Sequence, residues 1–345
     1  MRTPVKTVLT GFFWISFLVL ASCTQQEAVN DLSRGQDGKI RFYSSSRSFK
    51  DLFSKKGTAE TVVIEGKLTM PELIAKKVPA VIILHTATGN TGAGAEHYAE
   101  VARTLNKMGI AAFVVDSHKT RNIKSLKDGL TKITWEERVA DAYGALNLLS
   151  THPQIDSHKV AVMGFAGGGT VSLFSASKQV RDSLALNDLK FAAHIAFYPD
   201  SFTQLKNPDL TGAPVLLLLG EKDNLAPTAQ SLSYAKRLQL SGASVKVVVL
   251  DEAHHAFDFA MLAGSKMAYF MDMTSCQDRT FLLNEDGTWF SAYYGRAADQ
   301  LADFGDYTED CRSVDKPGTL GGPLKARTDA IKAYQGFLRE VFELS

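Results

Sequence analysis

The feature that most constrains this chain is a strand-like run that leads into a cluster of glycines. Residues 159–170 read Lys-Val-Ala-Val-Met-Gly-Phe-Ala-Gly-Gly-Gly-Thr. The apolar, valine-containing first half is typical of a buried parallel strand. Glycines permit a turn whose backbone packs too closely for Cβ atoms, and a helix-compatible run follows them. The segment therefore predicts a sharp strand-turn-helix junction that carries one small side chain, Ala166, at its apex.

The remainder of the chain alternates between two kinds of pattern. Short apolar runs predict strands at 79–85, 111–116, 191–197, 214–219 and 245–250, and a hairpin strand is predicted at 61–71. Helical spacing is found at 96–108, 135–149, 228–240 and 324–342. Such alternation predicts an α/β fold, with a doubly wound, mostly parallel sheet covered on both faces.

Composition narrows the class of protein. The chain has 345 residues, of which 45% are hydrophobic, and a formal net charge of +1. These values suit a globular protein and give no electrostatic reason to expect a nucleic-acid partner. The glycines at 167–169 are not followed by the Lys-Ser/Thr of a phosphate loop, and neither a dinucleotide fingerprint nor metal-ligand spacing is found. We therefore predict no cofactor and no metal.

Several motifs, in this order, resemble the dienelactone hydrolase branch of the α/β-hydrolase superfamily. They are 79–85, Val115–Arg121, Arg138–Asp141, Gly164–Gly169, Leu219–Asp223 and His255–Asp258. Each is short, but together they span nearly the whole chain after residue 60. The resemblance implies an α/β-hydrolase fold and hydrolysis of carboxylic esters or lactones through an acyl-enzyme. The segment 164–169 would be the nucleophile elbow, which aims a hydroxyl at the substrate.

The triad of this fold occurs in the order nucleophile, acid, base. The resemblance places the acid at Asp223, although such turns often hold an aspartate for structural reasons. It places the base at His255 rather than its neighbour His254, because the motif His-Ala-Phe-Asp begins at 255. The nucleophile position holds Ala166, whose methyl group cannot attack a carbonyl.

The resemblance also assigns the groups around the reacting carbonyl. The backbone N–H groups of Ala87 and Gly167 would form the oxyanion hole. Arg121 could clamp a substrate carboxylate in bidentate fashion, or it could brace its own loop by pairing with an aspartate. Ser117 and Thr170 are the nearest hydroxyls, and we expect neither to replace the missing nucleophile.

Three interpretations of Ala166 stay open. The chain could be an esterase whose nucleophile was removed by engineering. It could be an exported pseudoenzyme that binds a small carbonyl ligand or a protein partner. It could also hydrolyse slowly, with His255 activating a water, because an oxyanion hole and binding alone leave about 10³–10⁴-fold catalysis over water. In each case the family activity, ester or lactone hydrolysis, is lost or weak in this chain.

The first 58 residues differ from the rest. Residues 1–22 have two early basic residues and an apolar stretch, and they predict a signal peptide. This segment ends in Leu-Ala-Ser-Cys at 20–23, which resembles a bacterial lipobox. An ordinary signal peptide or a short membrane anchor would also agree with the sequence. Lipidated Cys23 would hold the protein in a membrane, and we expect the periplasm-facing outer membrane. Residues 23–58 are predicted to be a polar tether, and 59–345 the α/β-hydrolase domain.

An insertion at about 259–323 precedes the last helix and contains Cys276 and Cys311. It is rich in aromatic residues, which suits a cover over the pocket, although a surface excursion is the alternative. Export to an oxidising compartment predicts that these two cysteines form a disulfide. Closing a loop of this length should contribute about 3–4 kcal/mol.

The lipobox generates a prediction about the mature N-terminus. Processing at this motif should leave Cys23 as the first residue and attach acyl chains to it. Mass spectrometry of protein extracted from the membrane fraction should find an acylated N-terminal peptide that begins at Cys23. A free mature N-terminus at any other residue would contradict the lipobox, and Cys23→Ala should release the protein from membranes.

Overall fold

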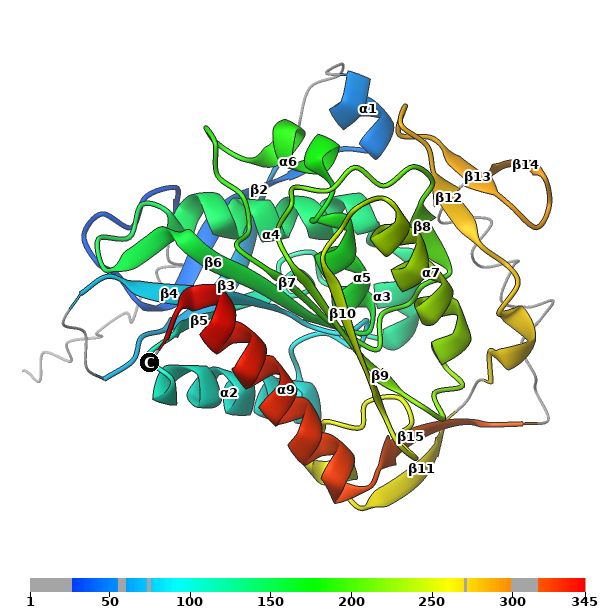
Figure 1. The fold of residues 1–345 in the computed structure, drawn as a ribbon. Helices are drawn as coiled ribbons and strands as arrows, with labels where there is room; N and C mark the ends of the chain where they lie inside the picture. Colours follow the sequence, from blue (N-terminus) through cyan, green and yellow to red (C-terminus); the bar gives the residue numbers. More distant parts are fainter. Residues whose placement is uncertain (1–26, 55–59, 73–75, 270–271, 299–315, 345) are drawn as a thin grey trace, which may run out of the picture.

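The computed structural model describes residues 27–54, 60–72, 76–269, 272–298 and 316–344. Within them a nine-stranded sheet crosses the molecule in the order β1-β2-β3-β5-β4-β6-β7-β9-β10 (Figure 1). The strands are β1 (Ala28–Val29), β2 (Gly38–Ser46), β3 (Glu60–Thr69), β4 (Val78–Leu84), β5 (Ala111–Asp116), β6 (Ile155–Phe165), β7 (His194–Phe197), β9 (Val215–Gly220) and β10 (Val245–Leu250). The ladders from β5 to β10 are parallel, whereas β3 pairs antiparallel with both β2 and β5.

The central strands are buried on both faces, as their unbroken apolar runs predict. Ile82 of β4 and Val162 of β6 point into one hydrophobic cluster, and the next residues, Ile83 and Met163, point into another. Successive side chains on a strand face opposite sides, so each strand supplies two cores. The predicted strands after residue 60 are all present.

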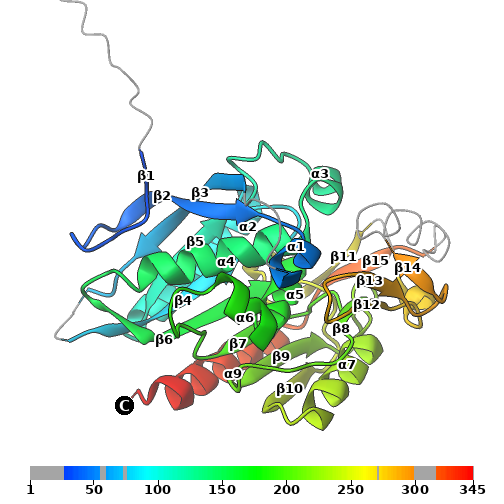
Figure 2. The ribbon, with the colours of Figure 1, turned by 90° about the horizontal axis from the view of Figure 1, so that it is seen from above.

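Helices cover both faces of the sheet (Figures 1 and 2). One face carries α4 (Trp135–Leu149), α5 (Gly167–Phe174), α6 (Lys178–Leu184) and α7 (Thr228–Leu240), and the other carries α2 (Gly92–Lys107) and α9 (Leu324–Phe342). The short helix α3 (Leu126–Thr131) precedes α4. Helix α4 begins with a full capping box, because Thr134 and Glu137 bond each other's backbone N–H groups. The doubly wound α/β architecture is therefore confirmed.

The N-terminal segment corrects one prediction. Residues 23–58 were predicted to be a polar tether, but over 28–54 they form β1, β2 and helix α1 (Phe49–Ser54). Strand β2 pairs along its whole length with β3, and it buries Ile40 and Phe42. Only one face of this strand is covered, so its alternation leaves half of its residues polar. Judged by composition alone, a segment with this alternation is therefore similar to a polar linker. The predicted boundary at residue 59 is therefore too late.

The insertion before the last helix begins and ends in a paired ribbon. Its first part is a single 3₁₀ turn, η1 (Ala260–Leu262), followed by β11 (Ser265–Tyr269), which pairs antiparallel with β15 (Gly318–Gly322). Between them, β12 (Phe281–Leu283), β13 (Trp289–Ser291) and β14 (Arg296–Ala298) form a small sheet with β8 (Thr203–Leu205). Trp289 is buried against Phe49 and Phe174. The aromatic residues therefore join this small sheet to α1 and α5.

Three predictions of the sequence fall outside the described residues in whole or in part. The signal peptide at 1–22 and the lipidation site Cys23 lie there, and so does Cys311. Its predicted partner Cys276 is buried at the end of the 3₁₀ turn η2 (Thr274–Cys276), and the bridge stays a prediction. Among the helices that the structure describes, none has the length and the apolar character needed to cross a bilayer.

The corrected N-terminus can be tested on two neighbouring residues of β2. Phe42 is 1% exposed and Tyr43 is 45% exposed. Phe42→Ala should lower the free energy of unfolding by about 3–5 kcal/mol, because it empties a packed site between sheet and helix. Tyr43→Ala should change it by less than about 1 kcal/mol. Chemical denaturation measures both, and two equally small effects would support a tether instead.

Candidate active site

The candidate site lies where the sheet reverses its winding direction. Strands β4 and β6 are neighbours, but the chain leaves β4 for α2 on one face and leaves β6 for α5 on the other. The two connecting loops therefore separate at the carboxyl ends of these strands. In open α/β sheets this divergence leaves a crevice in which ligands bind.

The turn after β6 has the geometry of a nucleophile elbow. Ala166 has φ 48° and ψ −117°, a backbone conformation that costs a residue with a Cβ about 1–3 kcal/mol. Its N–H donates to Phe197 O at 3.0 Å, and its carbonyl accepts from Thr170 N at 3.1 Å. The sharp junction predicted from the glycine pattern is therefore present, with a methyl group at its apex.

The glycines of the elbow are required by close backbone contacts. A Cβ on Gly164 would overlap the carbonyl oxygen of Gly168, and one on Gly168 would overlap that of Leu84. A Cβ on Gly169 would lie 2.9 Å from Phe197 O. The elbow is thus in contact with the ends of both neighbouring strands, which fixes its position in the crevice.

Two of the predicted triad residues meet across two loops. His255 Nδ1 lies 2.8 Å from Asp223 Oδ2. The other carboxylate oxygen of Asp223 accepts from the N–H groups of Leu225 and Ala226, both at 2.9 Å. With the Asp223 side chain 1% exposed, these bonds orient the carboxylate and fix the histidine tautomer that carries its proton on Nδ1. The Nε2 lone pair of His255 is then available as a base.

A second group of buried residues, next to the Asp223–His255 pair, contacts the ring of His255. The ring of Tyr198 lies 4.6 Å from that of His255, and its hydroxyl donates to Asp258 Oδ1 at 2.5 Å. The other carboxylate oxygen of Asp258 lies 2.9 Å from His97 Nε2. Burial and the nearby charge of Asp258 raise the pKa of Tyr198, so the phenol keeps its proton. The motif at 255–258 contains Asp258, but the sequence did not indicate its partners.

The two predicted oxyanion donors are oriented by the carbonyl groups that precede them. Thr86 O accepts from Gly89 N at 3.1 Å and lies 2.6 Å from His85 Nδ1. Ala166 O is held by the first turn of α5. In a trans peptide the N–H points opposite to the C=O. The N–H groups of Ala87 and Gly167 therefore point away from these bonds, and within the described residues no acceptor is recorded for either.

Beneath the two donor segments lie two neutral histidines and a cation. The guanidinium of Arg138, on α4, donates to the carbonyl oxygen of His85. Burial and the charge of Arg138 lower the pKa of His85 well below its ordinary value, and the same causes lower that of His118 to about 3. Both histidines are therefore uncharged at neutral pH. They fill space beneath the loop, with ring centroids 4.4 Å apart.

The structure contradicts a substrate-binding role for Arg121. Its guanidinium forms a bidentate pair with Asp141, at 2.7 and 2.9 Å, and also donates to Ser117 O at 2.8 Å. A carboxylate of the protein thus occupies the face of the guanidinium that a substrate carboxylate would need. The bracing alternative describes this residue correctly.

The neighbouring hydroxyls are not placed as nucleophiles. Thr170 Oγ1 donates to Asp200 O at 2.8 Å and is buried inside α5. Ser117 is also buried, and its N–H donates to His85 Nε2 at 3.1 Å. Neither residue stands at the apex of the elbow.

A second carboxyl group near His255 was not predicted. Asp200 is the third residue after β7, and its Oδ1 accepts from Phe202 N at 2.9 Å. Burial raises its pKa to about 6, whereas the charge of His255 acts in the opposite direction. The sequence could have indicated Asp200 only through its position shortly after a predicted strand. Aspartates that merely stabilise a turn occupy the same position.

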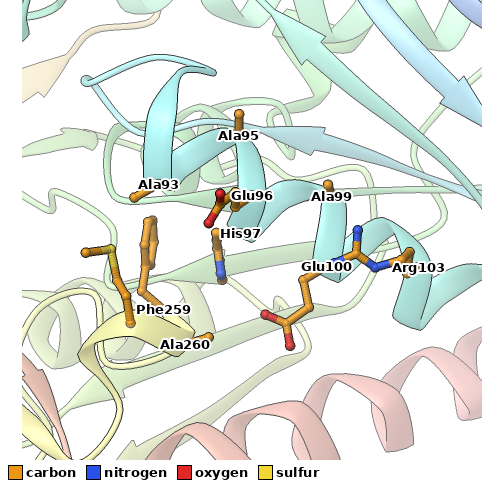
Figure 3. Close-up of a pocket in the computed structure, with 10 residues that line it drawn as sticks. Ala93, Ala95, Glu96, His97, Ala99, Glu100, Arg103, Phe259 and Ala260 are labelled. Atoms are coloured by element: carbon orange, nitrogen blue, oxygen red, sulfur yellow. The ribbon is translucent and has the colours of Figure 1, made fainter.

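A groove of about 450 Å³ lies beside the site, between α2 and residues 259–261 (Figure 3). Phe259 stacks on the buried ring of His97, with centroids 4.0 Å apart, and these two residues form part of its wall. The groove does not include Ala166, Asp223 or His255. Among the described residues we find no cluster of His, Cys, Asp and Glu able to hold a metal.

The crowding at the elbow generates a prediction about stability. Gly164→Ala should lower the free energy of unfolding by about 3 kcal/mol or more, since the methyl group would overlap backbone atoms that cannot move aside. Gly336→Ala is the matched control, because a Cβ there meets nothing within 4 Å in helix α9. That change should stabilise by about 0.5–1 kcal/mol. Denaturant titration measures the free energy of unfolding of both variants. A Gly164→Ala variant as stable as the unaltered protein would contradict the packing described for the elbow.

Comparison with known proteins identifies relatives of modest similarity. A curated protein of Bradyrhizobium sp., named as a probable 2-oxo-3-(5-oxofuran-2-ylidene)propanoate lactonase, is 24% identical over 198 residues, which are 54% of this chain and 75% of the relative. "Protein usf" of Aquifex pyrophilus is 27% identical over 187 residues, 52% of this chain and 76% of the relative.

Solved structures of similar fold include a dienelactone hydrolase-like promiscuous phosphotriesterase from metagenomic libraries. It is 17% identical, with a TM-score of 0.47, over 88% of this chain and 99% of that one. An acetyl ester-xyloside bifunctional hydrolase from Caldicellulosiruptor lactoaceticus is 20% identical, with a TM-score of 0.42, over 56% of this chain and 79% of that one.

The sequence pattern of one family matches more than half of the chain, from residue 64 to residue 268, and includes the elbow and the His255–Asp223 pair. The chain belongs to the dienelactone hydrolase family, within the α/β-hydrolase superfamily.

Proposed function

We propose that this chain keeps the carbonyl site of a carboxylic ester or lactone hydrolase but works without a covalent nucleophile. It would bind a small ester-like or carbonyl ligand in the crevice above Ala166. Hydrolysis there is slow, because His255 must activate a water in place of a serine hydroxyl. The family activity supports the class of ligand, and Ala166 supports the loss of the acyl-enzyme route.

One observation carries this proposal. Ala166 is held in the strained elbow conformation although it supplies no reacting atom. The surrounding machinery is kept with it: His255 still bonds Asp223 at 2.8 Å, and the elbow still contacts the carbonyl end of β4. Strain of this kind persists only where neighbours enforce it and is concentrated at functional sites. The arrangement supports a site still shaped around a carbonyl carbon.

The residues have separate roles in this mechanism. His255 Nε2 accepts a proton from water, and the carboxylate of Asp223 stabilises the imidazolium that forms. The water oxygen bonds to the carbonyl carbon, and the N–H groups of Ala87 and Gly167 donate hydrogen bonds to the negatively charged oxygen that results. The bond from the carbonyl carbon to the leaving oxygen then breaks. The imidazolium then returns its proton to the leaving alkoxide. No step requires the missing hydroxyl, but water is less well placed than a fixed serine, so turnover is low.

The second candidate function is binding without turnover. The methyl group of Ala166 favours it, since it removes the atom on which family chemistry depends. In that case the crevice would hold a carbonyl ligand or a protein partner, and His255 would not act as a base.

The location of the protein belongs to the same proposal. We propose an exported lipoprotein, anchored through Cys23 in the outer membrane and facing the periplasm. A Cys276–Cys311 bridge would suit that oxidising compartment and would close the insertion around its small sheet.

Restoring the hydroxyl tests the proposal. Ala166→Ser should create esterase activity on nitrophenyl esters and labelling by a fluorophosphonate probe. The alanine form should stay near background, because losing a triad nucleophile costs roughly 10⁶-fold in kcat. The gained activity should disappear in Ala166→Ser/His255→Ala. It should survive in Ala166→Ser/His254→Ala, since His254 Nδ1 faces Lys222 O instead of the acid.

Two results would oppose the retained site. If Ala166→Ser neither reacts with the probe nor turns over, the crevice no longer presents a nucleophile to a carbonyl. If its activity is the same with and without His255, the histidine is not the base. Ligand binding that survives His255→Ala, together with an inert serine variant, would favour the binding protein.

A further inference from the structure

The indole ring of Trp135 lies against the elbow. Gly167, the residue after the apex, has no side chain, and the place of its missing Cβ is 3.2 Å from Cζ3 and 3.3 Å from Cη2 of Trp135. Few real Cβ contacts are so short, so the ring fills the space that a side chain at 167 would need. The N–H of Gly167, a predicted oxyanion donor, is one covalent bond from the same Cα. Trp135 is only partly buried, which leaves part of it accessible next to the elbow.

The segment that leads into Trp135 also contacts the loop of the other predicted donor. Gly129, a buried residue of α3, packs so closely on this loop that a Cβ there would overlap the carbonyl oxygen of Ala87. The stretch from Gly129 to Trp135 therefore lies against both backbone segments that are predicted to bind the carbonyl oxygen. It forms one wall of the crevice.

The backbone of this wall is held on both sides of Trp135. The capping box of Thr134 and Glu137 fixes the first turn of α4, in which Trp135 is the first residue. Glu136 is 4% exposed, and its Oε1 accepts from Trp289 Nε1 at 3.4 Å. The indole ring of Trp135 thus projects from a fixed backbone, which suits a wall that sets the size of a pocket.

The strand order indicates which part of a ligand faces Trp135. Helix α4 packs against β4, β5 and β6, whereas Asp223 and His255 lie in the loops after β9 and β10. Because β6 stands between these two groups of strands, Trp135 and His255 lie on opposite sides of the elbow. The leaving oxygen of an ester must face His255 to receive its proton. The acyl group, on the other side of the carbonyl carbon, then points to Trp135.

We propose that Trp135 restricts the acyl group of the ligand to a short chain, so that the preferred ligands are esters of small acids such as acetic and butyric acid. A longer chain would have to displace the indole ring or bend back into solvent. Each methylene that a pocket does not accept costs about tenfold or more in specificity. The inference rests on the proposed function, because it requires a carbonyl carbon held above Ala166.

The first test measures turnover after the hydroxyl is restored. Nitrophenyl butyrate and nitrophenyl octanoate differ only in the acyl chain, and Ala166→Ser should show a kcat/KM at least about tenfold higher for butyrate. Ala166→Ser/Trp135→Ala should reduce this ratio to about twofold or less, with Trp135→Phe in between. Ala166→Ser/Tyr43→Ala is the control, because it shortens an exposed aromatic residue of β2 and should keep the ratio.

The second test needs no nucleophile. Butyramide and octanamide keep the carbonyl group and are titrated into the unaltered protein by ligand-observed NMR. Butyramide should bind at least about tenfold more tightly, although octanamide is the more hydrophobic of the two. Trp135→Ala should reduce the difference to about twofold or less. Circular dichroism shows whether each variant is folded.

The two tests separate this inference from the proposed function. Equal treatment of the short and the long chain, by Ala166→Ser or by the unaltered protein, would overturn the role of Trp135 whether or not Trp135→Ala folds. A short-chain preference that persists in folded Trp135→Ala or Trp135→Phe would overturn it too, since another group would then set the limit. An inert Ala166→Ser rejects the proposed function, and the amide comparison still decides the role of Trp135. An active Ala166→Ser whose preference does not depend on Trp135 rejects only this inference.

Discussion

The close contact between two backbone segments at the end of the sheet determines the rest of the site. Gly168 packs against the last carbonyl groups of β4, and Gly164 packs against Gly168 itself. No side chain can stand between them, so the elbow must turn within one residue, and Ala166 must take a positive φ. The same contact brings the loop after β4 beside the first turn of α5. The positions of the two predicted oxyanion donors therefore follow from steric crowding between backbone segments.

The two arginines behind this contact, Arg121 and Arg138, differ in the groups that they pair with. Arg121 is neutralised by Asp141, and together they tie the loop after β5 to helix α4. Arg138 lies on that same helix and donates to the carbonyl oxygen of His85, and the charge of Asp141 opposes the lowering of its pKa by burial. Asp141 therefore acts on both arginines, although among the described residues it forms a direct ion pair only with Arg121. The sequence leaves two roles open for Arg121, a clamp for a substrate carboxylate or a brace for its own loop, and the pair with Asp141 agrees with the brace.

Much of the fold could be predicted because its signals are local. Unbroken apolar runs indicate β4, β5, β6 and β9, and the glycines at the elbow indicate a backbone that no other residue permits. Strand β2 could not be recognised in the same way, because a strand that is covered on only one face alternates polar with apolar residues and has the composition of a linker. The Asp223–His255 contact was expected from chain order, but the contacts of Tyr198 with His255 and Asp258 depend on how the loop after β7 packs against the loop after β10. Burial of Arg138 likewise arises only when helix and sheet are assembled.

The corrected N-terminus changes how close such a protein would lie to a bilayer. With a lipid on Cys23 and strand β1 beginning at Ala28, only five peptide units join the acyl chains to the nine-stranded sheet. Fully extended, they reach about 18 Å. A long tether would let the domain sample a wide volume above the lipid. With an acylated Cys23, a linker this short would keep the edge strand β1 close to the headgroups and would restrict rotation of the domain.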